Sequence, residues 1–241
     1  MSAPRKKAAR SARRAHLASD RGEPTAARES RVLRKKLESR GRLLDAAFRL
    51  MAERGLDGVA IQEITEAADV ATGGFYNHFK SKQDIYFALT RRVFEDFGDA
   101  LDVLVAKLED PAEVVAVCIR QTVLRAKREP VWGQFLLREG LSPDAARRGL
   151  GSRLRRDIQR GIERGRFKPL DPVMAFVATG GAVLAAISVQ LHAMKGDADV
   201  GPRMAAIALQ LLGLSAREAE RVAKRSLPEA RIVAAVGGTK D

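Results

Sequence analysis

The stretch ATGGFYNHFKSKQDI, residues 71–85, is the part of the sequence that best indicates what the chain does. Two adjacent glycines stand near its start, two phenylalanines flank a Tyr-Asn-His run, and two lysines precede the first acidic residue, Asp84. Glycine lets a backbone approach another surface closely, and Tyr, Asn, His and Lys side chains can all donate hydrogen bonds. A short, positively charged helix of this kind is suited to contact phosphate groups.

Helical periodicity surrounds this stretch on both sides. Apolar residues recur every three or four positions over 32–53 and over 82–107, which predicts two long helices. Two short helices are predicted between them, at 61–68 and 72–78, separated by the residues DVA. A longer helix followed by two short ones and a tight turn is the arrangement of a helix-turn-helix unit, whose second helix enters the major groove of DNA.

The rest of the chain also reads as helices. Proline and glycine divide it into helical lengths, and no stretch shows convincing strand alternation. Further helices are predicted at 110–129, 130–141, 143–166, 172–194, 201–212 and 215–225. The sequence therefore predicts an all-α protein of about nine or ten helices that begins with a helix-turn-helix domain.

Positive charge is concentrated near the N-terminus. The formal net charge is +13, and residues 1–40 hold 13 Lys/Arg against 4 Asp/Glu. Residues 1–31 contain too little apolar surface to offset chain entropy, so we expect a disordered basic tail there and a frayed tail at 229–241. The tail is either a solvated segment or an arm attracted to phosphates, and its Arg- and Ala-rich start also resembles an organellar transit peptide.

Several classes of function lack support in the sequence. The single cysteine, Cys118, cannot form an internal disulfide, which fits a reducing compartment. The three histidines, His16, His78 and His192, are far apart, and no phosphate-binding loop, zinc-protease motif or nucleophile elbow occurs. We therefore expect no enzyme activity, no catalytic residue, no cofactor and no metal.

Residues 173–194 contain no formal charge and are numerous enough to span a bilayer. Polar residues such as Gln190, His192 and Thr179 interrupt them, and a Gly-Gly pair lies at the centre. A helix buried at a protein–protein interface is the favoured interpretation, a helix buried within one subunit is the alternative, and no membrane partner is expected.

Residues 41–89 resemble the DNA-binding domain of the TetR family of bacterial transcriptional repressors. The resemblance rests on MAERGLDG at the end of the first helix, ITEAADV in the second, GGFYNHF in the third and KSK before the fourth. The family pattern departs at four positions, where Ala60, Asp69, Ala71 and Gly74 replace residues that usually cap helices, form the turn or contact phosphate. Losing a helix cap costs about 1 kcal/mol, so weaker DNA binding is expected unless the basic tail compensates.

The resemblance implies a DNA-binding domain at 32–89 and a helical effector-binding and dimerisation domain at 90–228. It assigns DNA contact most directly to Tyr76, His78 and Lys82. The full predicted DNA-binding set is Gln62, Thr72, Gly73, Gly74, Tyr76, Asn77, His78 and Lys82.

A homodimer and a small-molecule effector are also implied. The predicted dimer interface comprises Phe176, Val177, Gly180, Leu184, Ile187, Leu191, Met204, Ile207 and Leu211. The predicted effector-binding residues are Phe97, Cys118, Gln121, Trp132 and Phe135, which offer apolar walls with one or two polar groups.

The resulting prediction is a sequence-specific transcriptional regulator in the bacterial cytoplasm, associated with the nucleoid when bound. It would be a repressor that a small molecule releases from a double-stranded DNA operator. The alternative is a non-specific protein that coats nucleic acid. An operator preference of about a thousandfold or more would distinguish the two.

Overall fold

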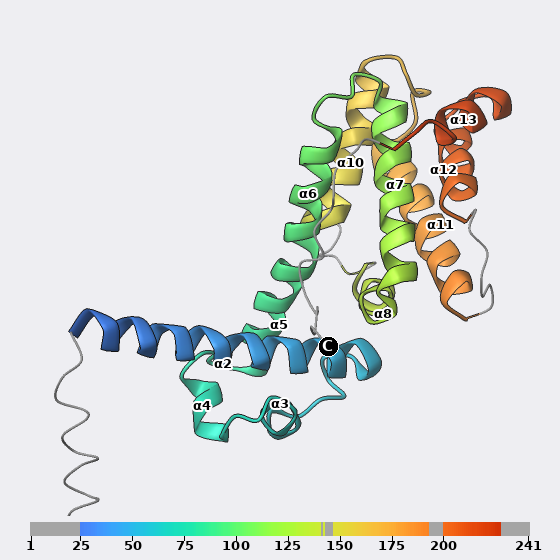
Figure 1. Cartoon of the computed structure of the whole chain (residues 1–241). Coiled ribbons are helices and arrows are strands. Elements are labelled where there is room, and N and C mark those ends of the chain that lie inside the picture. Colours follow the sequence, from blue (N-terminus) through green and yellow to red (C-terminus); the bar gives the residue numbers. More distant parts are fainter. Residues whose placement is uncertain (1–24, 141, 143–146, 193–199, 228–241) are drawn as a thin grey trace, which may run out of the picture. The chain divides into compact units, whose positions relative to one another are not determined.

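The computed structural model describes residues 25–140, 142, 147–192 and 200–227. Within these ranges every regular element is a helix, so the all-α prediction is confirmed (Figure 1). The elements are α2 (Thr25–Arg54), α3 (Ile61–Ala67), α4 (Thr72–Tyr76), α5 (Lys82–Thr90), the π-helical segment η1 (Arg91–Glu95), α6 (Asp96–Val105), α7 (Pro111–Arg128), α8 (Pro130–Glu139), α10 (Gly149–Glu163), α11 (Pro172–His192), α12 (Val200–Leu211) and α13 (Ala216–Ala223).

The described residues divide into two units, one that ends at Arg42 and one that begins at Leu43. Helix α2 begins at Thr25, earlier than the predicted start at 32, so residues 25–31 are helical rather than part of a disordered tail. Most of the predicted N-terminal tail, and the C-terminal tail at 229–241, lie outside the described residues.

Two phenylalanines anchor the short helix α4 within the second unit. Phe75 is fully buried and Phe79 is 2% exposed, with ring centroids 5.7 Å apart. Helix α5 begins at a reciprocal cap, in which Ser81 Oγ accepts from the Asp84 backbone N–H and Asp84 Oδ2 accepts from the Lys80 N–H. The two buried phenylalanines hold α4 with Tyr76 and Asn77 exposed, which agrees with their predicted role as anchors.

The long helix predicted at 82–107 has an irregular centre. The segment η1 interrupts it with one π-helical turn, and Val93 O there accepts a hydrogen bond from Trp132 Nε1 at 3.5 Å. The apolar residues Phe94, Phe97 and Leu101 keep a spacing of three or four in the sequence, so periodicity alone did not predict this turn.

Helix α7 lies at the centre of the remaining helices and packs against α8, α10, α11, α12 and α13 (Figure 1). It begins as predicted, with Asp110 Oδ1 accepting from the Ala112 N–H at 2.9 Å and Pro111 in the first turn. Helix α10 begins at Gly149 instead of 143, and residues 143–146 lie outside the described chain.

Candidate DNA-binding surface and effector cavity

Most of the predicted DNA contacts lie on α4 or directly after it. We call residues 60–82 the reading head. Tyr76 is 58% exposed, and Gly74 and His78 are half-buried. The other predicted residues of this region that are exposed are Gln62, Thr72, Gly73 and Asn77. Tyr, Asn, Gln and Thr side chains at such a surface can donate hydrogen bonds to phosphates or base edges.

The two glycines of α4 have different surroundings. A Cβ added to Gly73 would meet nothing within 4 Å, so Gly73 leaves open space at the start of the helix. A Cβ on Gly74 would lie 2.8 Å from Val70 Cγ1, so the chain itself restricts this position. Gly73 therefore offers room to an incoming partner, while Gly74 also serves packing within the reading head.

The turn between α3 and α4 uses an unusual residue. Asp69 has φ of 51°, in the left-handed region where the related pattern has glycine. Aspartate tolerates this conformation better than most side chains, although at a cost that glycine avoids.

Helix α3 starts without a side-chain cap at Ala60. Glu63 compensates in part, because its Oε2 accepts the Ala60 N–H at 2.7 Å and its Oε1 pairs with Arg54 Nη1 at 2.7 Å. The Ala60 N–H and then Arg54 lower the pKa of Glu63 below its usual value. The glutamate half of a capping box thus replaces the hydroxyl that the sequence lacks.

Lys82 is half-buried, and its Nζ lies 3.5 Å from Asp57 O. This contact ties the start of α5 to the loop before α3, next to the reading head. Its predicted role in DNA contact stays a prediction.

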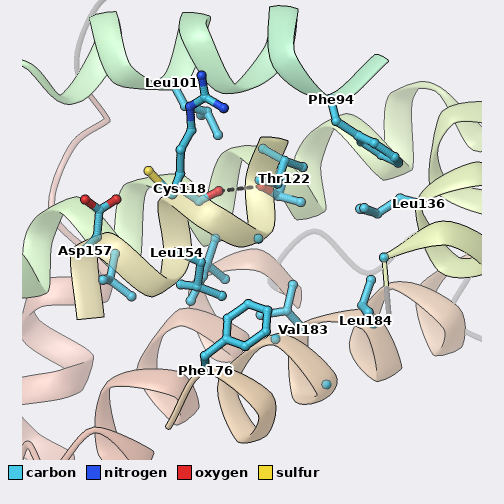
Figure 2. A pocket seen from close by; sticks show the side chains of 18 of the residues that line it. Phe94, Leu101, Cys118, Thr122, Leu136, Leu154, Asp157, Phe176, Val183 and Leu184 are labelled. Carbon is cyan, nitrogen blue, oxygen red and sulfur yellow. Dashed lines mark hydrogen bonds between the residues drawn. The ribbon is translucent and has the colours of Figure 1, made fainter. Parts of the chain in front are cut away.

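A cavity of about 260 Å³ lies among the helices of the second unit (Figure 2). Its walls are mostly apolar, and in Figure 2 Asp157 and Cys118 lie at the end opposite Phe94 and Leu136. The lining residues are Phe94, Leu101, Asp102, Val115, Cys118, Ile119, Thr122, Leu136, Gly140, Ser142, Arg148, Leu150, Gly151, Arg153, Leu154, Asp157, Phe176, Val177, Gly180, Gly181, Val183 and Leu184.

Charged groups at one side of the cavity neutralise one another. Arg156 joins Asp157 Oδ1 at 2.9 Å to Asp102 Oδ1 at 2.7 Å, and Arg153 Nε donates to Asp102 Oδ2 at 2.7 Å. Arg153 also binds Glu95 Oε2 at 2.8 Å, on the π-helical segment. The cavity therefore offers both carboxylate acceptors and guanidinium donors to a polar ligand group.

The two aspartates differ in their titration. Burial raises the pKa of Asp157, and the charge of Asp102 adds to this rise while Arg156 opposes it. Burial also acts to raise the pKa of Asp102, but hydrogen bonds from Arg156 and Arg153 outweigh it and lower that pKa. Asp157 is 6% exposed, so an unfavourably placed charge there would be stabilised by a ligand that donates a hydrogen bond.

Cys118 lines the same end of the cavity as a protonated thiol. Burial, reinforced by the charges of Asp157 and Asp102, raises its pKa to about 12. The thiol behaves here as a small apolar wall residue.

Of the predicted effector-binding residues, only Cys118 lines this cavity. Trp132 and Phe135 are fully buried and Phe97 is 1% exposed, and they pack in the core. Arg125 lies over the rings of Phe97 and Trp132, at 4.6 and 4.8 Å from their centroids. The large aromatic residues thus fill space instead of surrounding it.

Gln121, the remaining predicted residue, is half-buried and does not line the cavity. Asp102, Arg153 and Asp157, which are among the polar residues that line it, were not singled out from the sequence. A signal was present, because Asp157 adjoins the apolar stripe of an otherwise arginine-rich helix.

Helix α8 connects the cavity with α2 and α5. Leu136 and Gly140 line the cavity, and between them Arg138 and Glu139 point elsewhere. Arg138 Nε donates to Ala52 O at 2.8 Å and its Nη2 donates to Glu53 O, at the end of α2. Glu139 accepts a hydrogen bond from the Tyr86 hydroxyl of α5.

An aromatic contact runs parallel to these bonds. Phe94 lines the cavity and stacks on Phe135 with centroids 5.6 Å apart, and Phe135 meets Phe48 of α2 edge-on at 5.5 Å. One chain of direct contacts therefore joins the cavity wall to the first helix of the DNA-binding domain.

Helices α11 and α12 expose a set of apolar side chains. Helix α11 is long and apolar enough to cross a membrane by length and composition, but these properties are shared by core helices, and 22% of its most apolar window is buried. The exposed large residues on the two helices are Val173, Met174, Val177, Val189, Ile207 and Leu211.

The predicted dimer residues divide among three environments. Val177, Ile207 and Leu211 are exposed. Ile187 and Met204 are buried within the protomer, and Leu191 is half-buried. Phe176, Gly180 and Leu184 line the cavity, as Val177 also does. Because α11 is apolar all round, its sequence did not reveal which stripe faces outward.

Among the described residues, no three His, Cys, Asp or Glu side chains are grouped so that they could hold a metal ion.

Comparison with known proteins agrees with this arrangement. Residues 43–89 match the family model described as bacterial regulatory proteins, tetR family, and residues 110–225 match the tetracyclin repressor-like C-terminal domain. A solved structure of RolR in complex with resorcinol is 40% identical, with a TM-score of 0.63, and covers 82% of this chain and 98% of its own. The chain belongs to the TetR family.

Curated relatives of this TetR-family chain are named as repressors. The HTH-type transcriptional repressor DhaR of Mycobacterium sp. (strain GP1) is 35% identical over 41% of this chain, and KstR2 of Rhodococcus jostii (strain RHA1) is 34% identical over 32%. The matched regions span 48% of DhaR and 39% of KstR2. The family and these relatives are transcriptional regulators rather than enzymes.

Proposed function

We propose that the protein is a repressor that binds an operator through the reading head and releases it when a small hydroxylated aromatic molecule occupies the cavity. The observation that carries this proposal is the connection through α8, where Leu136 lines the cavity while Arg138 and Glu139 bind α2 and α5. A surface suited to DNA and a cavity suited to a small molecule are thus joined by direct contacts.

Size and chemistry support this class of effector. An apolar cavity of roughly 150 Å³ accommodates benzene, so about 260 Å³ leaves room for one substituted ring. Asp157 and Asp102 can accept hydrogen bonds from ring hydroxyls, and Phe176 offers an aromatic face nearby (Figure 2). The 40% identical RolR was solved with resorcinol, a dihydroxybenzene, which makes resorcinol the appropriate first probe.

Effector binding would act on the DNA-binding domain through α8 and η1. A ligand that displaces Leu136 or Phe94 would shift Arg138, Glu139 and Phe135 from their contacts with α2 and α5. The ligand needs to prefer the released conformation by only about 1–3 kcal/mol to weaken operator binding by about 5- to 150-fold.

A homodimer fits the exposed apolar side chains of α11 and α12. Burying these residues against a second copy would remove them from water and would present two reading heads to a near-palindromic operator. We place the protein in the bacterial cytoplasm, where such an operator is found. We keep the predicted domain limits of 32–89 for DNA binding and 90–228 for effector binding and dimerisation as part of this proposal.

The test is a fluorescence-anisotropy competition at physiological salt. The full chain is titrated against the duplex upstream of its own gene and against a shuffled duplex of equal composition, each with and without resorcinol. We expect a preference of about a thousandfold for the upstream duplex, reduced at least fivefold by resorcinol.

Each failure has a distinct meaning. Equal, salt-sensitive affinity for both duplexes would favour a nucleic-acid-coating protein over a repressor that controls its own gene. A strong preference that resorcinol leaves unchanged would retain the repressor and reject the proposed effector class.

A further inference from the structure

Residues 25–42 form a helical segment whose side chains are on the surface. From Arg28 to Arg42 every described residue is exposed except Ser39 and Gly41, which are half-buried. Helices in proteins are usually stabilised by packing an apolar face, and this segment buries none of its described side chains. Its surface chemistry therefore determines what it can bind.

The segment is strongly basic. Residues 25–42 contain seven Lys/Arg and two Glu, a net charge of +5 in a chain whose total is +13. Arg34 and Glu38 form an ion pair at 3.5 Å, and the net charge of +5 already includes this glutamate. Such a concentration of positive charge on one helical segment attracts polyanions.

Four of the cations share one side of the helix. At about 100° per residue, Arg28, Arg31, Lys35 and Arg42 fall within a sector of about 60°, and Leu37 lies on the opposite side. With a rise of about 1.5 Å per residue, the four extend over about 21 Å. We call these four residues the basic stripe.

A duplex of DNA matches this stripe in charge and in length. Double-stranded DNA carries one negative charge per about 1.7 Å of its axis, so about 21 Å of helix can reach several phosphates. The segment is also covalently continuous with residues 43–54 of α2, which belong to the matched DNA-binding domain. This continuity favours DNA over other polyanions.

We propose that the basic stripe is a second DNA-binding surface, which contacts phosphates beside the operator without reading sequence. This inference extends the proposed function and rests on it, because the same DNA molecule would engage both surfaces. The stripe would supply affinity that the reading head lacks, since Ala60 and Ala71 provide no side-chain helix cap.

The test uses the full chain with the basic stripe neutralised by Arg28→Gln, Arg31→Gln, Lys35→Gln and Arg42→Gln. Glutamine is a good helix former, so the helix should persist, and circular dichroism checks this. We expect affinity for both the upstream and the shuffled duplex to fall about tenfold or more. The slope of log affinity against log salt should fall by about 0.9 for each phosphate that the variant no longer neutralises.

A matched control removes the same charge elsewhere. Lys107→Gln, Arg128→Gln, Arg155→Gln and Arg217→Gln together neutralise four exposed cations of the second unit. We expect this control to change affinity less than about twofold if direct contact with phosphates, and not net charge, is responsible. A second control, Arg28→Lys, Arg31→Lys and Arg42→Lys, keeps the charge and should keep the salt slope.

Three outcomes would overturn the inference. The stripe variant could retain wild-type affinity and slope, or the matched control could weaken binding as much as the stripe variant does. A third outcome concerns binding to phosphatidylserine vesicles, measured for the wild type and the stripe variant. If the wild type binds these vesicles and the variant does not, while DNA affinity is unchanged, the partner of the stripe is a membrane surface.

Failure of the proposed function can be distinguished from failure of this inference. If the wild type shows no preference for the upstream duplex and the stripe variant still binds both duplexes more weakly, the second surface stands without the repressor. If the wild type binds neither duplex, both proposals are rejected.

Discussion

The reading head and the effector cavity present polar groups in opposite ways. The reading head leaves Tyr76 and Asn77 exposed to water and buries mainly apolar residues, among them its anchors Phe75 and Phe79. At the cavity, by contrast, Asp157 is buried and already accepts a hydrogen bond from Arg156 without a ligand. A surface for a large polyanion can remain open because the partner brings many charges, whereas a site for a small molecule must already be neutral and shaped.

This difference predicts that the two regions respond to different substitutions. Changes of charge in the reading head should act on DNA affinity alone. Changes in the cavity should act on effector affinity alone. Only residues that join the two regions should alter the coupling between them.

The largest expected effect is from Gly73→Glu. The Cβ meets open space, so the fold should be retained, but the carboxylate would face DNA phosphates. Like charges brought together at an interface cost several kcal/mol, so operator affinity should fall by about a hundredfold or more. Fluorescence anisotropy measures this decrease.

Gly73→Ala is the matched control for the same position. It adds the Cβ without the charge and should reduce affinity far less than Gly73→Glu does. Unchanged operator binding in Gly73→Glu would show that the start of α4 does not approach DNA.

Asp157→Asn should weaken resorcinol binding by about 10- to 100-fold while leaving operator affinity unchanged. The reason is the removal of a buried charged acceptor, and a hydrogen bond to a charged group contributes about 1.5–3 kcal/mol. Isothermal titration calorimetry of the free protein gives the ligand affinity. Glu163→Gln, an exposed change on the same helix, is the control and should behave as the wild type.

Arg138→Gln tests the connection between the two regions. Its hydrogen bonds to Ala52 O and Glu53 O would be broken or weakened, while neither the cavity wall nor α4 is altered. Operator and resorcinol affinities measured separately should each change little. Their coupling, measured as operator affinity with and without resorcinol, should fall by about 0.5–2 kcal/mol. Full coupling in this variant would exclude Arg138 as part of the connection.

The smallest expected effect is on stability in acid. Arg156 and Arg153 hold the pKa of Asp102 below its ordinary value of 3.8, despite the opposing effect of burial. The unfolded chain therefore takes up the Asp102 proton at higher pH than the folded chain does. The free energy of unfolding rises with pH through that window, and this contribution disappears as pH falls below about 4 through the folded pKa.

Asp102→Asn should accordingly flatten the decline in stability between about pH 5 and pH 2. Because Asp102 is partly exposed, we expect less than about 1 kcal/mol, measured by urea unfolding at each pH. An identical pH profile in wild type and variant would contradict a lowered pKa for Asp102.

The sequence predicts the reading head better than it predicts the cavity. The reading head is one short continuous segment, so its glycines, its missing helix caps and its anchors Phe75 and Phe79 are visible in order. The cavity is assembled from residues far apart in the chain, such as Phe94, Asp157 and Gly180. It is defined by where side chains are small or absent, and a set of bulky aromatic residues predicts core instead.

Which side of α11 is exposed could not be predicted from the sequence either. Val177, which is exposed, and Ile187, which is buried, are similar in hydrophobicity, and only the packing of α7 and α12 separates them. The regular apolar spacing of the sequence likewise did not mark the π-helical segment. The residue types at the reading head were therefore predictable, whereas the exposed side of α11 was not.

The π-helical segment η1 also sets the rotational phase between the two regions. An α-helix turns about 100° per residue, and a π-helical turn accommodates one residue more than an α-helical turn. Deleting one residue between Arg91 and Glu95 would restore a regular helix and rotate Phe94 or Ile85 away from its present neighbours. The number of residues between the reading head and the cavity consequently matters to a single residue. An insertion or deletion in η1 would rotate one site relative to the other while leaving the residues of each site unchanged.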